Sequence, residues 1–212
     1  MNETRPEEYR AKHKPPIIRS ECALMVIDAQ NDFFSPGGKF VPEKSYYAER
    51  VRAIIKPIKK LVEFAVNVSM PVLYSMTQFS PGHIDDVTIS RARELGGIVR
   101  GTWGAAIITE LAPQKSDRVF VFEAQHFDKF LNTNVEILLR RLAVRTVVIV
   151  GATTNVCCES TARGARERDF YPVVLSDCVA AFDDNWQRVS MEIIDRFFGS
   201  VLTSKEILEI LA

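Results

Sequence analysis

The chain has 212 residues, a mass of 23.9 kDa and no formal net charge at pH 7, with 27 basic and 27 acidic side chains. This length suits one domain with a sizeable hydrophobic core and is short for two independent domains. The basic side chains are scattered along the sequence. That distribution argues against nucleic acid or an anionic membrane surface as a partner, and a neutral small molecule is the better candidate.

The beginning of the chain is polar and charged, and no apolar run in the sequence is long enough to cross a membrane. We therefore expect an N-terminal arm over residues 1–20, a single domain over residues 21–212 and a cytoplasmic protein. The cysteines lack the density of a disulfide scaffold and the C-x-x-C pairing of a zinc site, so reduced thiols are expected. They are Cys22, Cys157, Cys158 and Cys178.

After the arm, short apolar runs rich in β-branched residues alternate with longer amphipathic segments. The runs predict strands at Ala23–Asp28, Pro71–Thr77, Arg118–Glu123, Thr146–Gly151, Pro172–Ser176 and Ser200–Leu202. The other segments predict helices at Ser45–Val68, Asn132–Leu142, Val156–Arg168, Asn185–Phe198 and Ser204–Leu211. This alternation predicts an α/β fold with a doubly wound, mainly parallel six-stranded sheet and helices on both faces.

Local signals add detail to this prediction. Thr133 followed by Glu136 predicts a capping box, and Ser204 is the expected N-cap of the last helix. Glycine and proline gather in two loops and a third stretch contains four glycines, and such long connections usually build the ligand site at the carboxyl ends of the strands. These segments are Ser35–Pro42, Ser80–Gly82 and Leu95–Gly104.

Two kinds of reactive side chain are expected at that edge of the sheet. Cys157 and Cys158 fall in the first turn of a predicted helix, where unpaired N–H groups and the helix dipole lower the pKa of a thiol. Their side chains point about 100° apart, so one can face a cleft while the other packs into the core. Asp28 ends the first predicted strand and could take the proton of such a thiol. The residues alone leave open which of the two cysteines gives its proton to Asp28 and acts as the nucleophile.

Other polar residues give weaker signals. Asp32 lies beyond the first strand and is expected to hold the following loop. The histidines, His13, His83 and His126, show no paired spacing, so a Cys–His dyad or a metal site is weakly supported.

Three segments carry a resemblance to a known family. ALMVIDAQNDFFSPGG, EAQHFDKFLNTN and GATTNVCCESTARGA resemble the signature regions of the isochorismatase-like cysteine hydrolase superfamily, over the chain from about Ala23 to its end. GTWGAAIITELAP and DCVAAFD are more similar to ureidoacrylate, biuret and N-carbamoyl amide hydrolases than to nicotinamidases, whose metal-binding D-x-H is not found here. The resemblance implies no cofactor, no metal and a homodimer or homotetramer.

The resemblance also implies roles for individual residues. Asp28 would activate the thiol of Cys157, and Cys158 would pack into the core. The Thr153–Thr154 peptide matches a bond that is cis in the family, and Thr154 with the N–H of Cys157 would form an oxyanion hole. The third member of the expected set is a lysine, and its position in this chain is occupied by Ala124.

Lys129 lies five residues beyond that position and is expected to face solvent. The resemblance therefore implies an amidohydrolase that cleaves a C–N bond of a small linear amide or ureido compound through a thioester. We expect this chain to be an impaired form, with an engineered Lys-to-Ala replacement at position 124 favoured over natural decay. An isochorismate-type vinyl-ether hydrolase and a non-catalytic binding or scaffold protein remain alternatives. The expected substrate-binding residues are Phe33, Gln78, Trp103 and Phe127.

Overall fold

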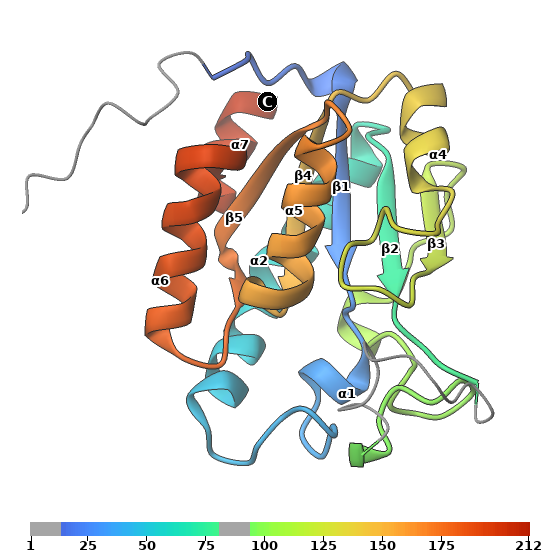
Figure 1. Ribbon diagram of the computed structural model, residues 1–212. Coiled ribbons are helices and arrows are strands. Elements are labelled where there is room, and N and C mark those ends of the chain that lie inside the picture. The colour runs from blue at the N-terminus through green and yellow to red at the C-terminus, as the bar shows by residue number, and fades with distance from the viewer. Residues whose placement is uncertain (1–13, 81–93) are drawn as a thin grey trace, which may run out of the picture.

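The structure is a computed structural model that describes residues 14–80 and 94–212 (Figure 1). His13 and His83 lie outside the described residues, as does most of the loop predicted at Ser80–Gly82. None of the helices in the described part of the chain is long and apolar enough to cross a membrane.

A six-stranded sheet forms the centre of the molecule, with the strand order β3-β2-β1-β4-β5-β6. Every pair of neighbouring strands is parallel. The predicted doubly wound α/β fold is thus confirmed, and all of its strands run in the same direction. The strands are β1 (Cys22–Ile27), β2 (Val72–Met76), β3 (Val119–Glu123), β4 (Thr146–Ala152), β5 (Tyr171–Ala180) and β6 (Ser200–Leu202).

Strand β5 differs most from its prediction, because it continues four residues beyond the expected end at Ser176. Asp177 is exposed within the strand, which interrupts the run of buried residues that marks the rest of it. The pairing of β4 with β5 also shifts register between Ile149 and Gly151. An irregular strand of this kind has no continuous apolar pattern in the sequence.

Each of the five predicted helices is present, although two begin or end with a wider π-helical turn. The described α-helices are α1 (Asn31–Phe34), α2 (Tyr46–Asn67), α4 (Val135–Arg141), α5 (Glu159–Arg166), α6 (Asp184–Ile193) and α7 (Ser204–Leu211). The π-turn η5 (Thr154–Cys158) precedes α5, and η6 (Ile194–Phe198) follows α6. Two short 3₁₀ turns, η2 (Arg19–Glu21) and η4 (Thr109–Leu111), complete the helical elements described.

Two predicted helix caps were wrong by small shifts in position. Helix α7 is capped by Thr203, which forms a capping box with Glu206, and not by Ser204. The N-cap of α4 is Asn134, which makes no side-chain cap hydrogen bond, and Thr133 Oγ1 accepts from the N–H of Val135, so the capping box predicted between Thr133 and Glu136 does not form. In both cases the N-cap lies one residue away from the predicted one, at Thr203 for α7 and at Asn134 for α4.

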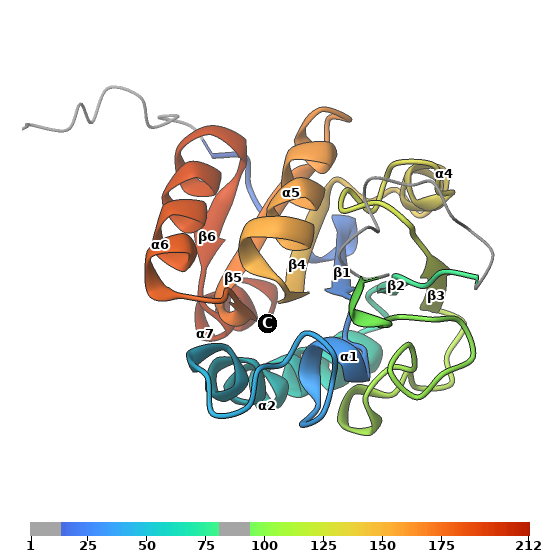
Figure 2. The ribbon, with the colours of Figure 1, turned by 60° about the horizontal axis from the view of Figure 1, so that its bottom comes forward.

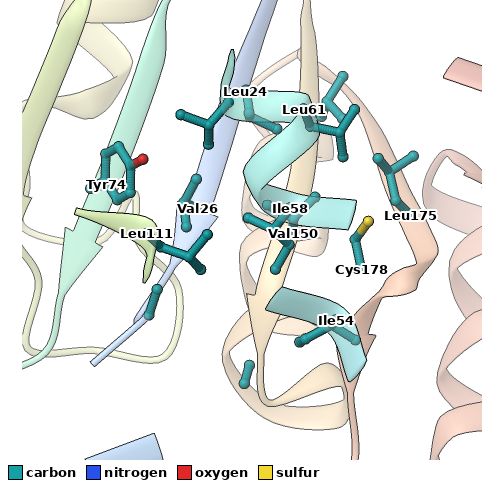
Figure 3. Packing of buried hydrophobic residues seen from close by; sticks show 14 of the residues in the cluster. Leu24, Val26, Ile54, Ile58, Leu61, Tyr74, Leu111, Val150, Leu175 and Cys178 are labelled. Atoms are coloured by element: carbon teal, nitrogen blue, oxygen red, sulfur yellow. The ribbon is translucent and has the colours of Figure 1, made fainter. Parts of the chain in front are cut away.

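Helices cover both faces of the sheet (Figure 2). Helices α2 and α7 pack on one face, where Ile54, Ile58 and Leu61 of α2 lie against alternate residues of β1, β4 and β5 (Figure 3). Helices α4 and α5 with η6 pack on the opposite face against the other alternate residues. Because both faces are buried, every residue of β1 and β4 is buried, as the near-continuous apolar runs in the sequence indicated.

Candidate active site

The candidate site lies where the chain leaves the two central strands. Strands β1 and β4 are neighbours in the sheet, and the connections that follow them lead to helices on opposite faces. In doubly wound sheets this switch point opens a crevice at the carboxyl ends of the strands. Asp28 directly follows β1, and the π-turn η5 with both cysteines follows β4.

The ends of these two strands approach each other closely. Gly151 of β4 pairs with Ile27 of β1, and a Cβ atom on Gly151 would lie 2.1 Å from the carbonyl oxygen of Ile27. Only glycine fits at this position, which also has a φ of 121°. Asp28 itself adopts a φ of 47°, a left-handed conformation that aspartate tolerates better than most residues. The cis peptide bond is Ala152–Thr153, one residue before the expected Thr153–Thr154 bond.

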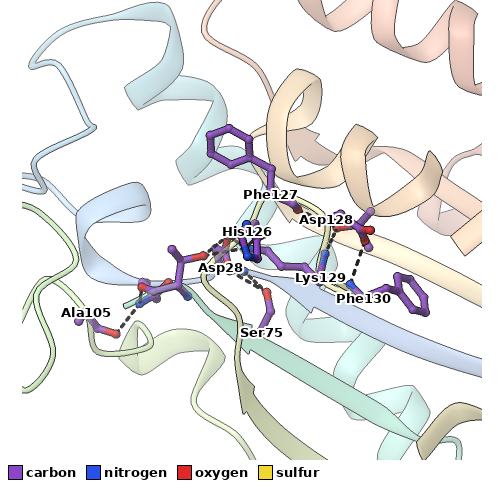
Figure 4. Close-up of polar contacts among 11 residues, drawn as sticks. Asp28, Ser75, Ala105, His126, Phe127, Asp128, Lys129 and Phe130 are labelled. Atoms are coloured by element: carbon purple, nitrogen blue, oxygen red, sulfur yellow. Dashed lines mark hydrogen bonds and ion pairs between the residues drawn. The ribbon is translucent and has the colours of Figure 1, made fainter. Parts of the chain in front are cut away.

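The carboxylate of Asp28 is fully buried and receives donors from two other elements (Figure 4). The hydroxyl of Ser75 on β2 donates to its Oδ1 over 2.7 Å. The hydroxyl of Thr77, which follows β2, donates to its Oδ2 over 3.0 Å. The ammonium of Lys129 lies 2.7 Å from the same Oδ2 atom. Asp28 is therefore held as part of a buried ion pair.

The position of Lys129 corrects the sequence interpretation. Its side chain was expected in solvent, but it is fully buried and its ammonium contacts Asp28. The same ammonium donates to Thr77 Oγ1 over 2.7 Å and to the carbonyl oxygen of His126 over 3.1 Å. Ala124 is indeed small and buried at the end of β3. The site nevertheless contains a lysine, so the reason for expecting an impaired enzyme no longer holds.

The loop after β3 explains why the spacing was misleading. Asp128 accepts a hydrogen bond from the N–H of Phe130 within this loop, and Thr161 of α5 accepts one from the N–H of Lys129. A Cβ atom on Gly164 of α5 would lie 2.3 Å from the Asp128 carboxylate, so the absence of a side chain there lets the loop sit on the helix. These contacts turn Lys129 inward. One signal in the sequence could have identified this lysine as the one in the site: Lys129 is the only lysine or arginine between Arg118 and Arg140.

Lys129 is also charged in this environment. Burial alone would lower the pKa of its ammonium, but the negative charge of Asp28 and the hydrogen bond to Asp28 oppose that effect. The net pKa of Lys129 is raised, so its ammonium stays charged across the neutral pH range.

Cys157 lies beside this ion pair within the second core cluster and is 6% exposed, whereas Cys158 is fully buried. Burial raises the pKa of the Cys157 thiol to about 12, and the charge of Lys129 opposes that rise. The charge of Asp28 and a hydrogen bond to it favour the protonated thiol further. The expectation of a lowered pKa at a helix start was therefore wrong, because desolvation outweighs the Lys129 charge and the backbone hydrogen bond that lower the pKa.

The π-turn that carries Cys157 is anchored by helix α6. The hydroxyl of Thr154 donates to Gln187 Oε1 over 2.7 Å, and both residues are buried. Ser190 of α6 donates to Glu159, the residue after Cys158, over 2.6 Å. The backbone of the proposed oxyanion hole is thus held from both ends of the turn.

The four expected substrate-binding residues have different environments. Phe33 stacks on Phe40 with ring centroids 4.8 Å apart, and the Gln78 amide donates to Glu123 over 2.6 Å. Trp103 is 57% exposed and Phe127 is 45% exposed. A role as a pocket wall stays a prediction for each of the four.

Two further expectations concern polar residues near the site. Asp32 holds its loop as expected, because its carboxylate accepts hydrogen bonds from the N–H groups of Lys39 and Ile98. His126 contributes its carbonyl oxygen to Lys129, while its ring lies 3.2 Å from the Asn132 amide. Within residues 14–80 and 94–212, no cluster of three histidine, cysteine or acidic side chains could hold a metal ion.

Comparison with curated proteins finds relatives over most of the chain. It is 28% identical to the ureidoacrylate amidohydrolase RutB of Agrobacterium fabrum over 211 residues, which covers 91% of each chain. It is 29% identical to the protein of the same name from Rhizobium rhizogenes, with 91% of this chain and 85% of the relative covered.

Solved structures include a cysteine hydrolase from Pseudomonas syringae pv. phaseolicola with a TM-score of 0.84 and 26% identity, covering 93% of this chain and 95% of that one. The N-carbamoylsarcosine amidase of Thermoplasma acidophilum has a TM-score of 0.71 and 27% identity, covering 87% of this chain and 96% of that one. The isochorismatase domain family matches residues 22–206, which include every residue of the site described above. With this match over most of its length, the chain belongs to the isochorismatase family of hydrolases.

Proposed function

We propose that this protein is a cysteine-dependent amidohydrolase that cleaves a C–N bond of a small linear amide or ureido compound through a thioester. One observation carries the proposal: a buried Asp28–Lys129 ion pair lies beside the thiol of Cys157 at the carboxyl edge of the sheet. A thiol with an adjacent base and a fixed positive charge is the arrangement of an activated nucleophile.

The mechanism starts from a protonated thiol, since the pKa of Cys157 is raised to about 12. As the sulfur attacks the carbonyl carbon, Asp28 accepts the thiol proton, and the C–S bond forms while the carbonyl π electrons move to oxygen. N–H groups of the π-turn Thr154–Cys158 stabilise this oxyanion. Asp28 then returns the proton to the leaving nitrogen as the C–N bond breaks. Water then attacks the thioester carbonyl while Asp28 accepts its proton, the C–S bond breaks to release the acid, and Asp28 returns the proton to the sulfur of Cys157.

Lys129 acts in this scheme as a fixed charge. Its three N–H groups have three acceptors, namely Asp28, Thr77 and the carbonyl oxygen of His126. None of the three N–H groups of Lys129 can protonate the leaving group without breaking one of these contacts. The ammonium instead compensates the negative charge that passes between Asp28 and Cys157 during the reaction.

The substrate class rests on the relatives and on charge balance near the site. Two of the relatives described above act on ureidoacrylate and one on N-carbamoylsarcosine, according to their names. Arg100 and Glu123, which lie beside Gln78, pair with each other and leave no net charge there. A small ureido or carbamoyl compound with an uncharged scissile end fits these features.

The test is a hydrolysis assay with the unmodified protein. Ureidoacrylate, biuret, N-carbamoyl amino acids and nicotinamide are supplied separately, and ammonia release is measured. We expect turnover of at least one ureido compound, loss of turnover in Cys157→Ser, and a mass increase on Cys157 when the reaction is quenched early. Cys158→Ser is the matched control and should keep most of the activity. Turnover that survives Cys157→Ser would refute the proposal.

A further inference from the structure

We propose that Ser75 and Thr77 are positioning residues that fix the Asp28 carboxylate by two donated hydrogen bonds and leave its Oδ1 atom to accept the proton of the Cys157 thiol. The kinetic part of this inference rests on the proposed function, whereas the arrangement itself rests on hydrogen bonds between buried groups. Ser75 is 1% exposed and Thr77 is 8% exposed, so water competes little with either contact.

The direction of the Ser75 hydroxyl is fixed by its second partner. The backbone N–H of Asp28 donates to Ser75 Oγ over 3.1 Å, and this group can only donate. Ser75 therefore uses its own hydrogen for Asp28 Oδ1, which lies 2.7 Å away. Aspartate and serine hold each other in a closed pair of hydrogen bonds.

The Thr77 hydroxyl also donates its hydrogen to Asp28, for a different reason. The ammonium of Lys129 donates to Thr77 Oγ1 over 2.7 Å and has no acceptor of its own. The hydroxyl hydrogen is thus left for Asp28 Oδ2, at 3.0 Å. Gln30 fixes the backbone of Thr77, because its side-chain amide bonds both the N–H and the carbonyl of that residue over 2.9 and 2.8 Å.

Counting acceptor sites then identifies the reacting oxygen. An ionised carboxylate has about four lone-pair sites, two on each oxygen. Both sites of Oδ2 are used, by Thr77 and Lys129, whereas among residues 14–80 and 94–212 only Ser75 donates to Oδ1. The remaining site on Oδ1 is the one left for the hydrogen of Cys157, whose thiol lies close enough to Asp28 for this carboxylate to raise its pKa. Oδ1 is therefore the atom that takes the proton.

This arrangement has a measurable consequence for pH dependence. Hydrogen bonds donated to a carboxylate favour its ionised form, so each hydroxyl lets Asp28 work as a base at lower pH. The other titratable groups that act on this cluster are Lys129, Cys157, Cys158 and Tyr47. None of these side chains is changed in the variants below. A shift in the acid side of the pH profile of Cys157 reactivity therefore reports the loss of the Ser75 or Thr77 hydroxyl.

The experiment measures the alkylation of Cys157 by iodoacetamide as a function of pH, with the modified peptide identified by mass spectrometry. It needs no substrate, so it stands even if the proposed function fails. The variants are Ser75→Ala and Thr77→Val, with Thr77→Ser as the conservative replacement. The matched controls are Thr146→Val and Ser200→Ala, which remove buried strand hydroxyls that lie away from Asp28. The pH profile of kcat/KM is recorded in parallel on any substrate that is turned over.

In Ser75→Ala and Thr77→Val, we expect the acid limb of Cys157 alkylation to move up by about one pH unit or more, the equivalent of one charge-assisted hydrogen bond. A fall in kcat/KM of about tenfold or more should accompany it. Thr77→Ser and both controls should follow the wild-type curve. Folding is checked by circular dichroism, and Ser75→Cys, with its weak donor, provides the same test if Ser75→Ala is unstable. Curves that superimpose on wild type in the folded variants would overturn the inference.

Discussion

Replacing Lys129 by methionine tests whether its ammonium lies in the site as the buried partner of Asp28. Methionine keeps much of the side-chain volume and removes the ammonium, so Asp28 loses its only positive partner among the described residues while retaining Ser75 and Thr77. If Lys129 lay in solvent, as its sequence position suggested, this change would affect neither stability nor turnover.

The expected magnitude follows from burial. Both charged side chains are fully buried and their N and O atoms are 2.7 Å apart. Removing one partner of such a pair leaves an unpaired buried charge and costs about 3–5 kcal/mol of unfolding free energy. The stability deficit should shrink at acid pH, where the unpaired carboxyl takes up a proton. Loss of a fixed charge from the site should reduce kcat on the order of 10²–10³-fold.

Urea unfolding followed by circular dichroism measures the first effect, and ammonia release measures the second. Lys205→Met is the matched control, because that side chain is 84% exposed and should change neither quantity. A second variant adds Ala124→Lys to Lys129→Met, which places an ammonium at the position where the family resemblance implied one, and should recover part of the lost turnover. Wild-type stability and turnover in Lys129→Met would refute the placement of this lysine in the site.

Three further predictions concern other parts of the molecule. Gly164→Ala should favour the helical state of α5 by about 1 kcal/mol of intrinsic helix free energy. It should nevertheless reduce turnover, because the new Cβ atom would displace Asp128 and with it Lys129. Thermal melts measure the first effect and activity assays the second. Unfolding free energy should fall as pH rises from 9 to about 12, since the pKa of Cys157 is raised from 9.0 to about 12 and only the unfolded chain loses the proton in that range; a smaller slope is expected in Cys157→Ser. Thr203→Ala should cost about 0.5–2 kcal/mol by removing the cap of α7, as measured by urea unfolding, and an unchanged midpoint would contradict that assignment.

The fold was predictable from the sequence because both faces of the sheet are covered. Near-continuous apolar runs marked β1 and β4, and the amphipathic period marked α2, each within one or two residues of the observed bounds. Strand β5 was predicted too short, because the exposed Asp177 interrupts its apolar pattern while the backbone stays extended. Periodicity reports burial, and it fails where a strand residue faces solvent.

The candidate site was predicted only in part. Asp28 and Cys157 follow strands, so their meeting at one edge followed from topology. Lys129 lies in an irregular loop whose shape depends on tertiary contacts with Thr161 and with Gly164 of α5. No sequence period describes such a loop, and spacing from a family pattern therefore assigned the lysine position to Ala124. The pKa of Cys157 was misjudged for a related reason, because its burial could not be read from a helix start.

The parallel pairing of β1 with β4 has a consequence for how the protein matures. These neighbouring strands are separated in the sequence by α1, α2, β2, η4, β3 and α4, and Cys22 aligns with Thr146 in their register. Pairings between such distant segments form slowly, because a long loop must close before any contact is gained. The environment of Cys157 is thus complete only after most of the chain has been synthesised and arranged. The rate at which a thiol reagent modifies Cys157 during refolding would therefore report when the last stage of sheet assembly is complete.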